Sequence, residues 1–267
     1  MSDHLQPRLG GTPFGASPSF ADLVRRERPE ALPVAQTDAR GADLVVPHGT
    51  TVLGLKYADG MLMAGDRRAT AGNQIADAKM RKVFPADDYS AIAIAGAAGQ
   101  AIEVVKLFQL ELEHYEKITG DRLSLEGKAN RLAQMIRQNF PMALQGLVVV
   151  PLFGGFDDRR GEGRIFYYDA TGGRWEEDDF QTTGSGGGPA KNSLKKRWRP
   201  GLTRDEAIRV AVEALIDAAE DDAATGGPDT VRKIWPVLIA VTAQGAEDVP
   251  EDQVVAAVEA VLQERGA

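Results

Sequence analysis

Strands and helices are predicted in blocks along this chain, and that order restricts the fold more than any other feature. From Thr50 the apolar residues follow the period of two typical of strands, and Asp59-Gly60 is a strong signal for a hairpin turn. Strands are expected at 50–57, 61–66, 82–85, 89–95, 146–156, 164–170, 179–183 and 233–243. Pairs of helices separate these groups, which argues against a doubly wound parallel sheet. The order predicts an α+β fold, a four-layer αββα sandwich of two antiparallel sheets between helix layers.

The helical segments show apolar stripes and recognisable ends. The first stripe ends at Gly120, the second is expected to end at Pro141, a short basic helix ends near Trp198, and Thr203-x-x-Glu206 forms a capping box. A last helix is expected at 251–265. The two stripes consist of Val104, Phe108, Leu112 and Tyr115, and of Leu125, Ala129, Leu132, Ile136 and Phe140.

Composition excludes several classes of protein. The chain of 267 residues has 43% hydrophobic and 26% charged residues, which is typical of a soluble globular protein. Its net charge of -8 disfavours a nucleic-acid or anionic-membrane surface. No apolar run approaches the ~20 residues needed to span a bilayer, and no secretory signal is expected at the N-terminus. The chain has no cysteine, so disulfides, thiolate nucleophiles and cysteine metal sites are excluded. We therefore expect a cytoplasmic protein without a metal or other cofactor.

Residues 1–49 differ in composition from the rest of the chain. They contain six of the fourteen prolines and show little periodicity. Composition alone favours a disordered tail. The alternative is a pro-segment that is removed by cleavage between Gly49 and Thr50, which would leave residues 50–267 as a single domain. The choice between them depends on the chemistry available at Thr50.

Thr50, Asp66 and Lys82 are spaced sixteen residues apart at the ends of the first strands. Each of them alone is ordinary for a strand or a strand end. A threonine hydroxyl needs an adjacent base to act as a nucleophile. The three histidines are His4, His48 and His114, two before Thr50 and one in a helix, so a histidine base is not expected. The candidate bases are then a lysine and an α-amino group. Cleavage before Thr50 would create an α-amine with a pKa of about 7.7–8.0, whereas Lys82 would need a lowered pKa or would act as a charged partner.

Several motifs together resemble one known family. These motifs are Gly49-Thr50-Thr51, Gly-Asp-Arg-Arg-Ala-Thr at 65–70, Lys82 and Ala95-Gly96. Together they resemble the motifs of the catalytic β subunit of the proteasome core particle, an N-terminal-nucleophile hydrolase. The resemblance covers about residues 50–245. The bacterial, actinobacterial type is the most similar. The resemblance to that type rests on the pro-segment before Thr50, on Asp-Ala-Ala-Thr-Gly-Gly-Pro-Asp at 222–229 and on the acidic C-terminal helix.

The resemblance implies a role for each matching residue. Thr50 would be the nucleophile, its own amine the proton acceptor, and Asp66 and Lys82 the supporting pair. The Gly96 N–H would supply the oxyanion hole, worth roughly 2.7–4 kcal/mol. Ser185, Asp222 and Thr225 would support the amine through hydrogen bonds. The family commonly has Asp-x-x-Ser-Gly, so Thr225 replaces a serine but retains the hydroxyl.

Substrate binding and partners are also implied by the resemblance. Thr70 and the backbone beside Ala98 would hold substrate as an extended strand. Homoheptameric β rings would stack between rings of α subunits, and an ATPase ring would deliver proteins tagged with a ubiquitin-like protein. A non-catalytic ring subunit of the same fold is the alternative, and a small-molecule amidase is disfavoured by these motifs. The first specificity pocket would be lined by Ala69, Met80, Ile94 and Ala98, which are apolar and predict cleavage after apolar residues.

Overall fold

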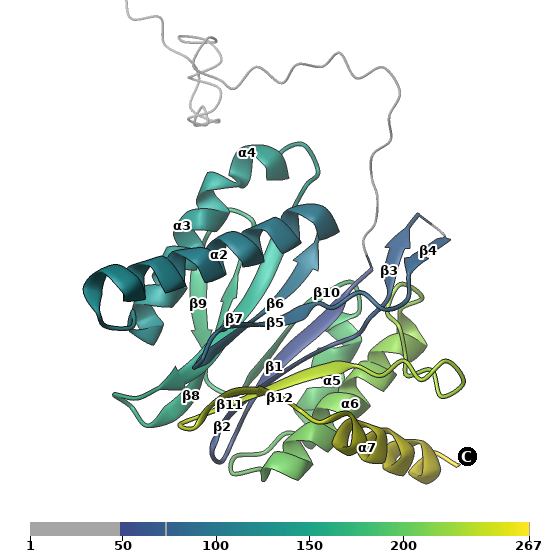
Figure 1. Ribbon diagram of the computed structural model, residues 1–267. Coiled ribbons are helices and arrows are strands. Elements are labelled where there is room, and N and C mark those ends of the chain that lie inside the picture. The colour runs from purple at the N-terminus through teal and green to yellow at the C-terminus, as the bar shows by residue number, and fades with distance from the viewer. Residues whose placement is uncertain (1–48, 73, 267) are drawn as a thin grey trace, which may run out of the picture. The chain divides into compact units, whose positions relative to one another are not determined.

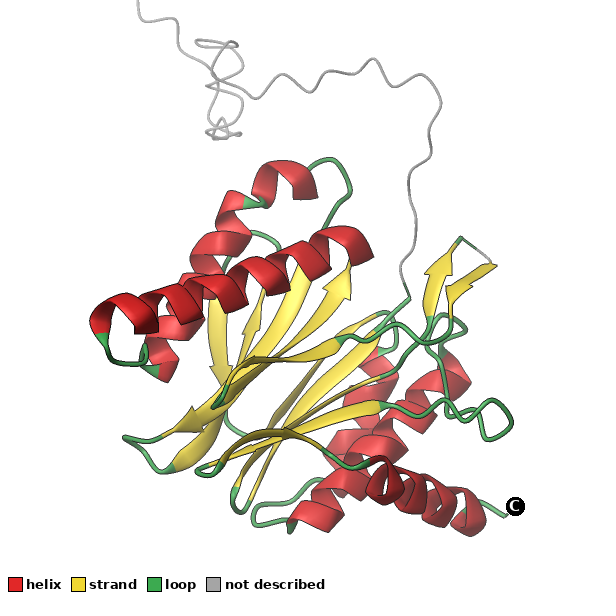
Figure 2. Cartoon of the chain, viewed as in Figure 1, coloured by secondary structure: helices red, strands yellow, loops and turns green. Residues whose placement is uncertain are grey.

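The computed structural model describes residues 49–72 and 74–266. Its layers are helices, an antiparallel sheet, a second antiparallel sheet and helices, as Figure 2 shows. The predicted αββα sandwich is therefore confirmed. The expected pro-segment, apart from Gly49, lies outside the described residues, as do His4 and His48.

The first sheet contains the strand that begins beside Thr50. Its strand order is β10-β1-β2-β11-β12, and all neighbours are antiparallel. The predicted hairpin is present, but it turns at Ala58 and Asp59, one residue earlier than Asp59-Gly60, and Gly60 begins β2 and pairs with Tyr57. The bounds are β1 Thr51–Tyr57, β2 Gly60–Gly65, β10 Phe180–Gly184, β11 Val237–Thr242 and β12 Gly245–Asp248.

The second sheet follows chain order, β5-β6-β7-β8-β9, and is also antiparallel throughout. A separate two-stranded sheet, β3-β4, projects beside the start of β1 in Figure 1. The bounds are β3 Ala69–Ala71, β4 Gln74–Asp77, β5 Val83–Asp87, β6 Ser90–Gly96, β7 Val149–Asp157, β8 Glu162–Tyr168 and β9 Arg174–Glu177.

Three apolar layers hold the sandwich together. One lies between the two sheets and includes Val52, Met63 and Leu152. A second packs the first sheet against α5, α6 and α7, and a third packs the second sheet against α2 and α3. The helices are α2 Ala98–Thr119, α3 Leu125–Gln138, α4 Phe140–Ala143, α5 Gly187–Arg197, α6 Arg204–Asp221 and α7 Glu251–Glu264. Both faces of each sheet are thus covered, which fixes the strand register against slippage.

Several helix ends agree with the sequence. Gly120 closes α2 with φ 77, and Thr203 and Glu206 form the predicted capping box of α6. Other details differ. Tyr115 is 41% exposed and Phe140 is 37% exposed, so neither belongs to the buried stripe assigned to it. The second helix ends at Gln138, before Pro141, which instead lies in the first turn of α4, where a proline costs no hydrogen bond.

Candidate active site

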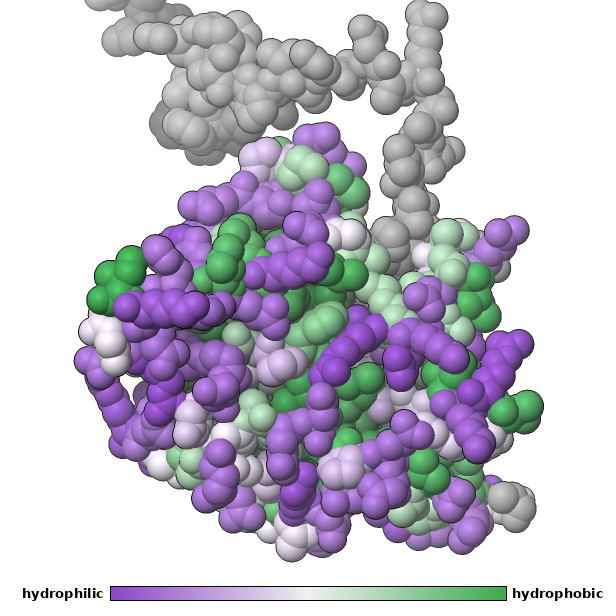
Figure 3. Space-filling model, in the orientation of Figure 1, coloured by the Kyte–Doolittle hydropathy of each residue, from purple (hydrophilic) through white to green (hydrophobic). Residues whose placement is uncertain are grey.

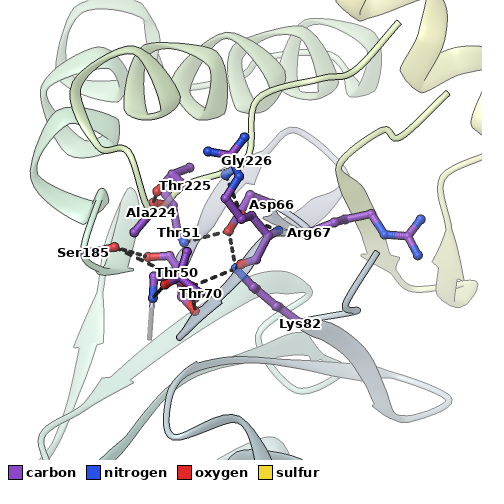
Figure 4. A network of polar contacts seen from close by, with 12 residues as sticks. Thr50, Thr51, Asp66, Arg67, Thr70, Lys82, Ser185, Ala224, Thr225 and Gly226 are labelled. Carbon is purple, nitrogen blue, oxygen red and sulfur yellow. Dashed lines mark hydrogen bonds and ion pairs between the residues drawn. The ribbon is translucent and has the colours of Figure 1, made fainter. Parts of the chain in front are cut away.

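Thr50 lies directly before β1, and its hydroxyl faces the peptide bond that precedes it. Its Oγ1 donates to the Gly49 carbonyl oxygen at 2.7 Å, and its backbone N–H donates to Ser185 Oγ at 3.2 Å. Thr50 is 4% exposed. Figure 4 shows Lys82 and Ser185 on opposite sides of it. The nucleophile expected from the sequence is therefore buried, oriented and next to a carbonyl of its own chain.

Gly49 is required by the close approach of another segment. A Cβ added at Gly49 would lie 2.1 Å from Ala224 Cβ and 2.4 Å from Ala224 O, which is too close for any side chain. The Gly49 N–H donates to Thr70 Oγ1 at 3.0 Å. The loop after α6 therefore excludes a side chain at this position.

Asp66 and Lys82 form a buried ion pair beside this peptide bond. Lys82 Nζ lies 2.6 Å from Asp66 Oδ1, and both side chains have at most 1% of their surface exposed. The carboxylate also accepts three backbone N–H groups, from Thr51 at 2.8 Å, Arg68 at 2.8 Å and Gly226 at 2.9 Å. Four donors converge on one carboxylate, so its position is fixed from two directions.

Lys82 Nζ is surrounded by oxygen atoms. Besides Asp66, it donates to Arg68 O at 2.6 Å and to Gly49 O at 3.3 Å. Three acceptors match the three protons of an ammonium group. Burial lowers the pKa of Lys82 below its ordinary value, and the neighbouring Asp66 carboxylate opposes that shift. Lys82 is therefore placed to polarise the Gly49 carbonyl and loses its proton more readily than an exposed lysine.

A second cluster lies on the amino side of Thr50. Ser185 Oγ is 2.5 Å from Asp222 Oδ2, and Thr225 Oγ1 donates to the same oxygen at 2.6 Å. Asp222 contacts the Thr50 nitrogen only through Ser185. Burial raises the pKa of Asp222, but hydrogen bonds from Ser185, Thr225 and the Ala224 N–H lower it more, so the net pKa is below its ordinary value. Asp222 is therefore an ionised acceptor at neutral pH.

The remaining predicted residues take no part in the hydrogen bonds described above for this network. Gly96 ends β6 with φ 113, where a Cβ would lie 2.0 Å from Val148 O. Ala69 begins β3, Met80 lies between β4 and β5, and Ala98 begins α2. Ile94 is 2% exposed and packs in the core beneath α2 and α3. Their roles in the oxyanion hole and the specificity pocket stay predictions.

Three contributors to the site were missed from the sequence. Arg68 and Gly226 act through backbone groups, which every residue has, so their side chains give no signal. In the sequence Thr51 is an ordinary β-branched residue of a predicted strand. Its hydroxyl lies 2.6 Å from Thr225 Oγ1, and both residues are fully buried. A second hydroxyl directly after Thr50 was the only available clue.

The described residues, 49–72 and 74–266, contain one histidine, His114. Among these residues, no group of three or more acidic or histidine side chains is arranged to hold a metal ion. No helix in the same part of the chain combines the length and apolar character needed to cross a membrane. His114 is exposed on α2. The site therefore offers a hydroxyl, a buried ion pair and an ionised carboxylate.

Two antiparallel sheets between helix layers are the fold of the N-terminal-nucleophile hydrolases. The chain belongs to the proteasome subunit family, whose family model matches residues 46–234. It is 52% identical over 253 residues to "Proteasome subunit beta" of Acidimicrobium ferrooxidans, covering 94% of this chain and 92% of that protein. It is 51% identical over 247 residues to "Proteasome subunit beta" of Frankia casuarinae, covering 92% and 90%. The actinobacterial resemblance is thereby confirmed.

Proposed function

We propose that this chain is a catalytic β subunit of a proteasome core particle, a threonine endopeptidase that matures by cleaving itself between Gly49 and Thr50. One observation supports this above all others. Thr50 Oγ1 and Lys82 Nζ both hydrogen-bond the Gly49 carbonyl oxygen, at 2.7 and 3.3 Å. The residue that would attack and a cation that would polarise its target are thus assembled around one peptide bond.

Self-cleavage proceeds in two steps. Thr50 Oγ1 bonds to the Gly49 carbonyl carbon, the carbon–nitrogen bond breaks, and the hydroxyl proton ends on the Thr50 nitrogen. Water then hydrolyses the resulting ester, which releases the Gly49 carboxylate and restores the hydroxyl. The Thr50 nitrogen is an amide before cleavage and cannot act as a base, so either Lys82 or a water molecule takes the proton.

The mature site uses the amine that cleavage creates. Ser185 accepts a hydrogen bond from the Thr50 nitrogen, which leaves the lone pair of the amine available to the hydroxyl proton. Thr50 Oγ1 then bonds to a peptide carbonyl carbon as its proton passes to the Thr50 amine. The peptide carbon–nitrogen bond breaks, the leaving amine takes that proton, and water hydrolyses the acyl-enzyme ester to a carboxylate and the free hydroxyl. Lys82 and Asp66 supply a fixed electrostatic field beside the reacting oxygen. The Gly96 N–H would stabilise the oxyanion.

Assembly into rings is the second part of the proposal. On α2, Leu107, Leu110 and Ile118 are 51%, 61% and 70% exposed, which is unusual for large apolar side chains on one helix. Figure 3 shows apolar surface among the polar side chains in the region of α2. This surface suits contact with other subunits, in seven-membered β rings stacked between α rings. The ATPase ring, the ubiquitin-like tag and the cytoplasmic location are proposed only from membership of the proteasome subunit family.

The test is to express the chain with an α-subunit partner and determine its intact mass and N-terminal residue. A mature chain that starts at Thr50 and cleaves fluorogenic peptides supports the proposal. Thr50→Ala should assemble, keep residues 1–49 and cleave no peptide. A full-length wild-type chain without peptidase activity would instead identify a non-catalytic ring subunit. A full-length chain that does cleave peptides would refute the mechanism.

A further inference from the structure

Thr51 connects the two halves of the candidate site. Its backbone N–H donates to Asp66 Oδ1 at 2.8 Å, the same oxygen that binds Lys82. Its hydroxyl lies 2.6 Å from Thr225 Oγ1, which in turn binds Asp222. The side chain of Thr51 is completely buried. One residue therefore touches the lysine half through its backbone and the carboxylate half through its side chain.

The direction of each hydrogen bond in the second half follows from counting protons. Asp222 is an ionised carboxylate and can only accept. Ser185 and Thr225 each have one hydroxyl proton, and each donates it to Asp222 Oδ2. Neither hydroxyl has a second proton to give.

Two further directions are then determined. Ser185 can only accept from the Thr50 nitrogen, because its proton already binds Asp222. For the same reason Thr225 can only accept from Thr51, so the Thr51 hydroxyl is the donor of that pair. A series of hydrogen bonds thus runs from Thr51 through Thr225 to Asp222. A second series runs from the Thr50 nitrogen through Ser185 to the same carboxylate.

The structure points to Thr51 as a positioning residue whose hydroxyl orients Thr225 and thereby holds Asp222 in place for Ser185. This inference rests on the proposed function, because the purpose of this series of hydrogen bonds is to orient the Thr50 nitrogen. Hydrogen bonds in series polarise one another, so the terminal donor strengthens the bond from Thr225 to the carboxylate. Thr51 touches no substrate atom in this proposal.

The space around the two hydroxyls supports a direct bond between them. A Cβ added at Gly186 would lie 2.3 Å from Thr51 Oγ1, 2.6 Å from Thr225 Oγ1 and 3.2 Å from Asp222 Oδ2. The Gly186 backbone therefore closes over the chain of hydroxyls. Only a residue without a side chain fits there, which is a physical reason for glycine directly after Ser185.

The test compares Thr51→Val, which replaces the hydroxyl with a methyl group, with Thr51→Ser, which keeps the hydroxyl and loses the methyl group. In the mature enzyme we expect Thr51→Val to lower kcat roughly three- to tenfold, as for the loss of one net hydrogen bond, with little change in KM. Thr51→Ser should stay within about twofold of wild type. Thr242→Val controls for the same exchange in another strand, because the Thr242 hydroxyl bonds Gln244 instead.

A double-mutant cycle tests the route through Thr225. Once Thr225→Val has interrupted the series of hydrogen bonds, Thr51→Val should cause no further loss of kcat. Equal losses in both backgrounds, or a Thr51→Ser variant as slow as Thr51→Val, would overturn the proposal. If Thr51→Val blocks maturation, Thr51→Ser must mature at the wild-type rate, and an equal block in both variants would overturn it. Wild type and Thr50→Ala are measured alongside. Only a wild-type chain that does not mature or cleave peptides, or a Thr50→Ala chain that does, would reject the proposed function itself.

Discussion

Replacing Asp66 by asparagine tests how strongly the buried ion pair holds the site together. Asp66 Oδ1 accepts from Lys82 and Thr51, and Oδ2 accepts from Arg68 and Gly226. An asparagine amide has one oxygen, so in either orientation its NH₂ group faces two donors. Lys82, with 1% of its side chain exposed, also loses its counter-charge. Breaking a buried pair in this way costs about 3–5 kcal/mol.

The expected loss can be measured by thermal unfolding. For a domain of this size about 1 kcal/mol corresponds to ~2–4 °C, so Tm should fall by roughly 6–20 °C. Both proteins should carry Thr50→Ala, so that residues 1–49 are retained in each and differences in maturation do not confuse the comparison.

The matched control is Asp248→Asn. Asp248 pairs with Arg81, but its side chain is 59% exposed, so its loss should cost less than about 1 kcal/mol. A fall in Tm for Asp66→Asn no greater than that for Asp248→Asn would refute the argument from burial. In a chain that retains the wild-type Thr50, Asp66→Asn should also prevent formation of the mature chain.

Three further outcomes are expected. Gly49→Ala should slow self-cleavage measured by intact mass, and adding Ala224→Gly should not restore it, because Ala224 O would still lie 2.4 Å from the new Cβ. The folded-state pKa of Asp222 lies below its ordinary 3.8. The stability that ionised Asp222 contributes is therefore present above pH 3.8 and disappears as the pH falls through the folded pKa. Between pH 7 and about pH 3 the Tm of Asp222→Asn should fall less than that of wild type. A panel of fluorogenic peptides should be cleaved fastest after apolar residues, and a preference for Arg or Glu would contradict the predicted pocket.

Much of the architecture could be predicted because its signals are local. The β1–β2 hairpin follows from alternating apolar residues around Asp59-Gly60, and the α6 capping box follows from two side chains three residues apart. Strands β3, β4, β9 and β12 were not predicted. They are short, and β4 is exposed along its whole length, so no alternation of apolar residues marks it. The start of α2 was also missed, because Ala97 provides no side-chain cap.

The candidate site shows the same division. Thr50, Asp66 and Lys82 could be selected from the sequence because their side-chain chemistry and spacing are visible there. Thr225 and Thr51 are 174 residues apart, and only the packing of the loop after α6 against β1 brings their hydroxyls together.

The sequence by itself thus determined the fold class and the choice of Thr50, Asp66 and Lys82 as candidate site residues, since periodicity and side-chain type are local properties. Tertiary structure decided what surrounds them. The backbone N–H groups on Asp66, the Arg68 carbonyl on Lys82 and the approach of Ala224 to Gly49 involve groups that every residue has. Such contacts have no signature in composition or spacing, and they exist only once distant segments are packed together.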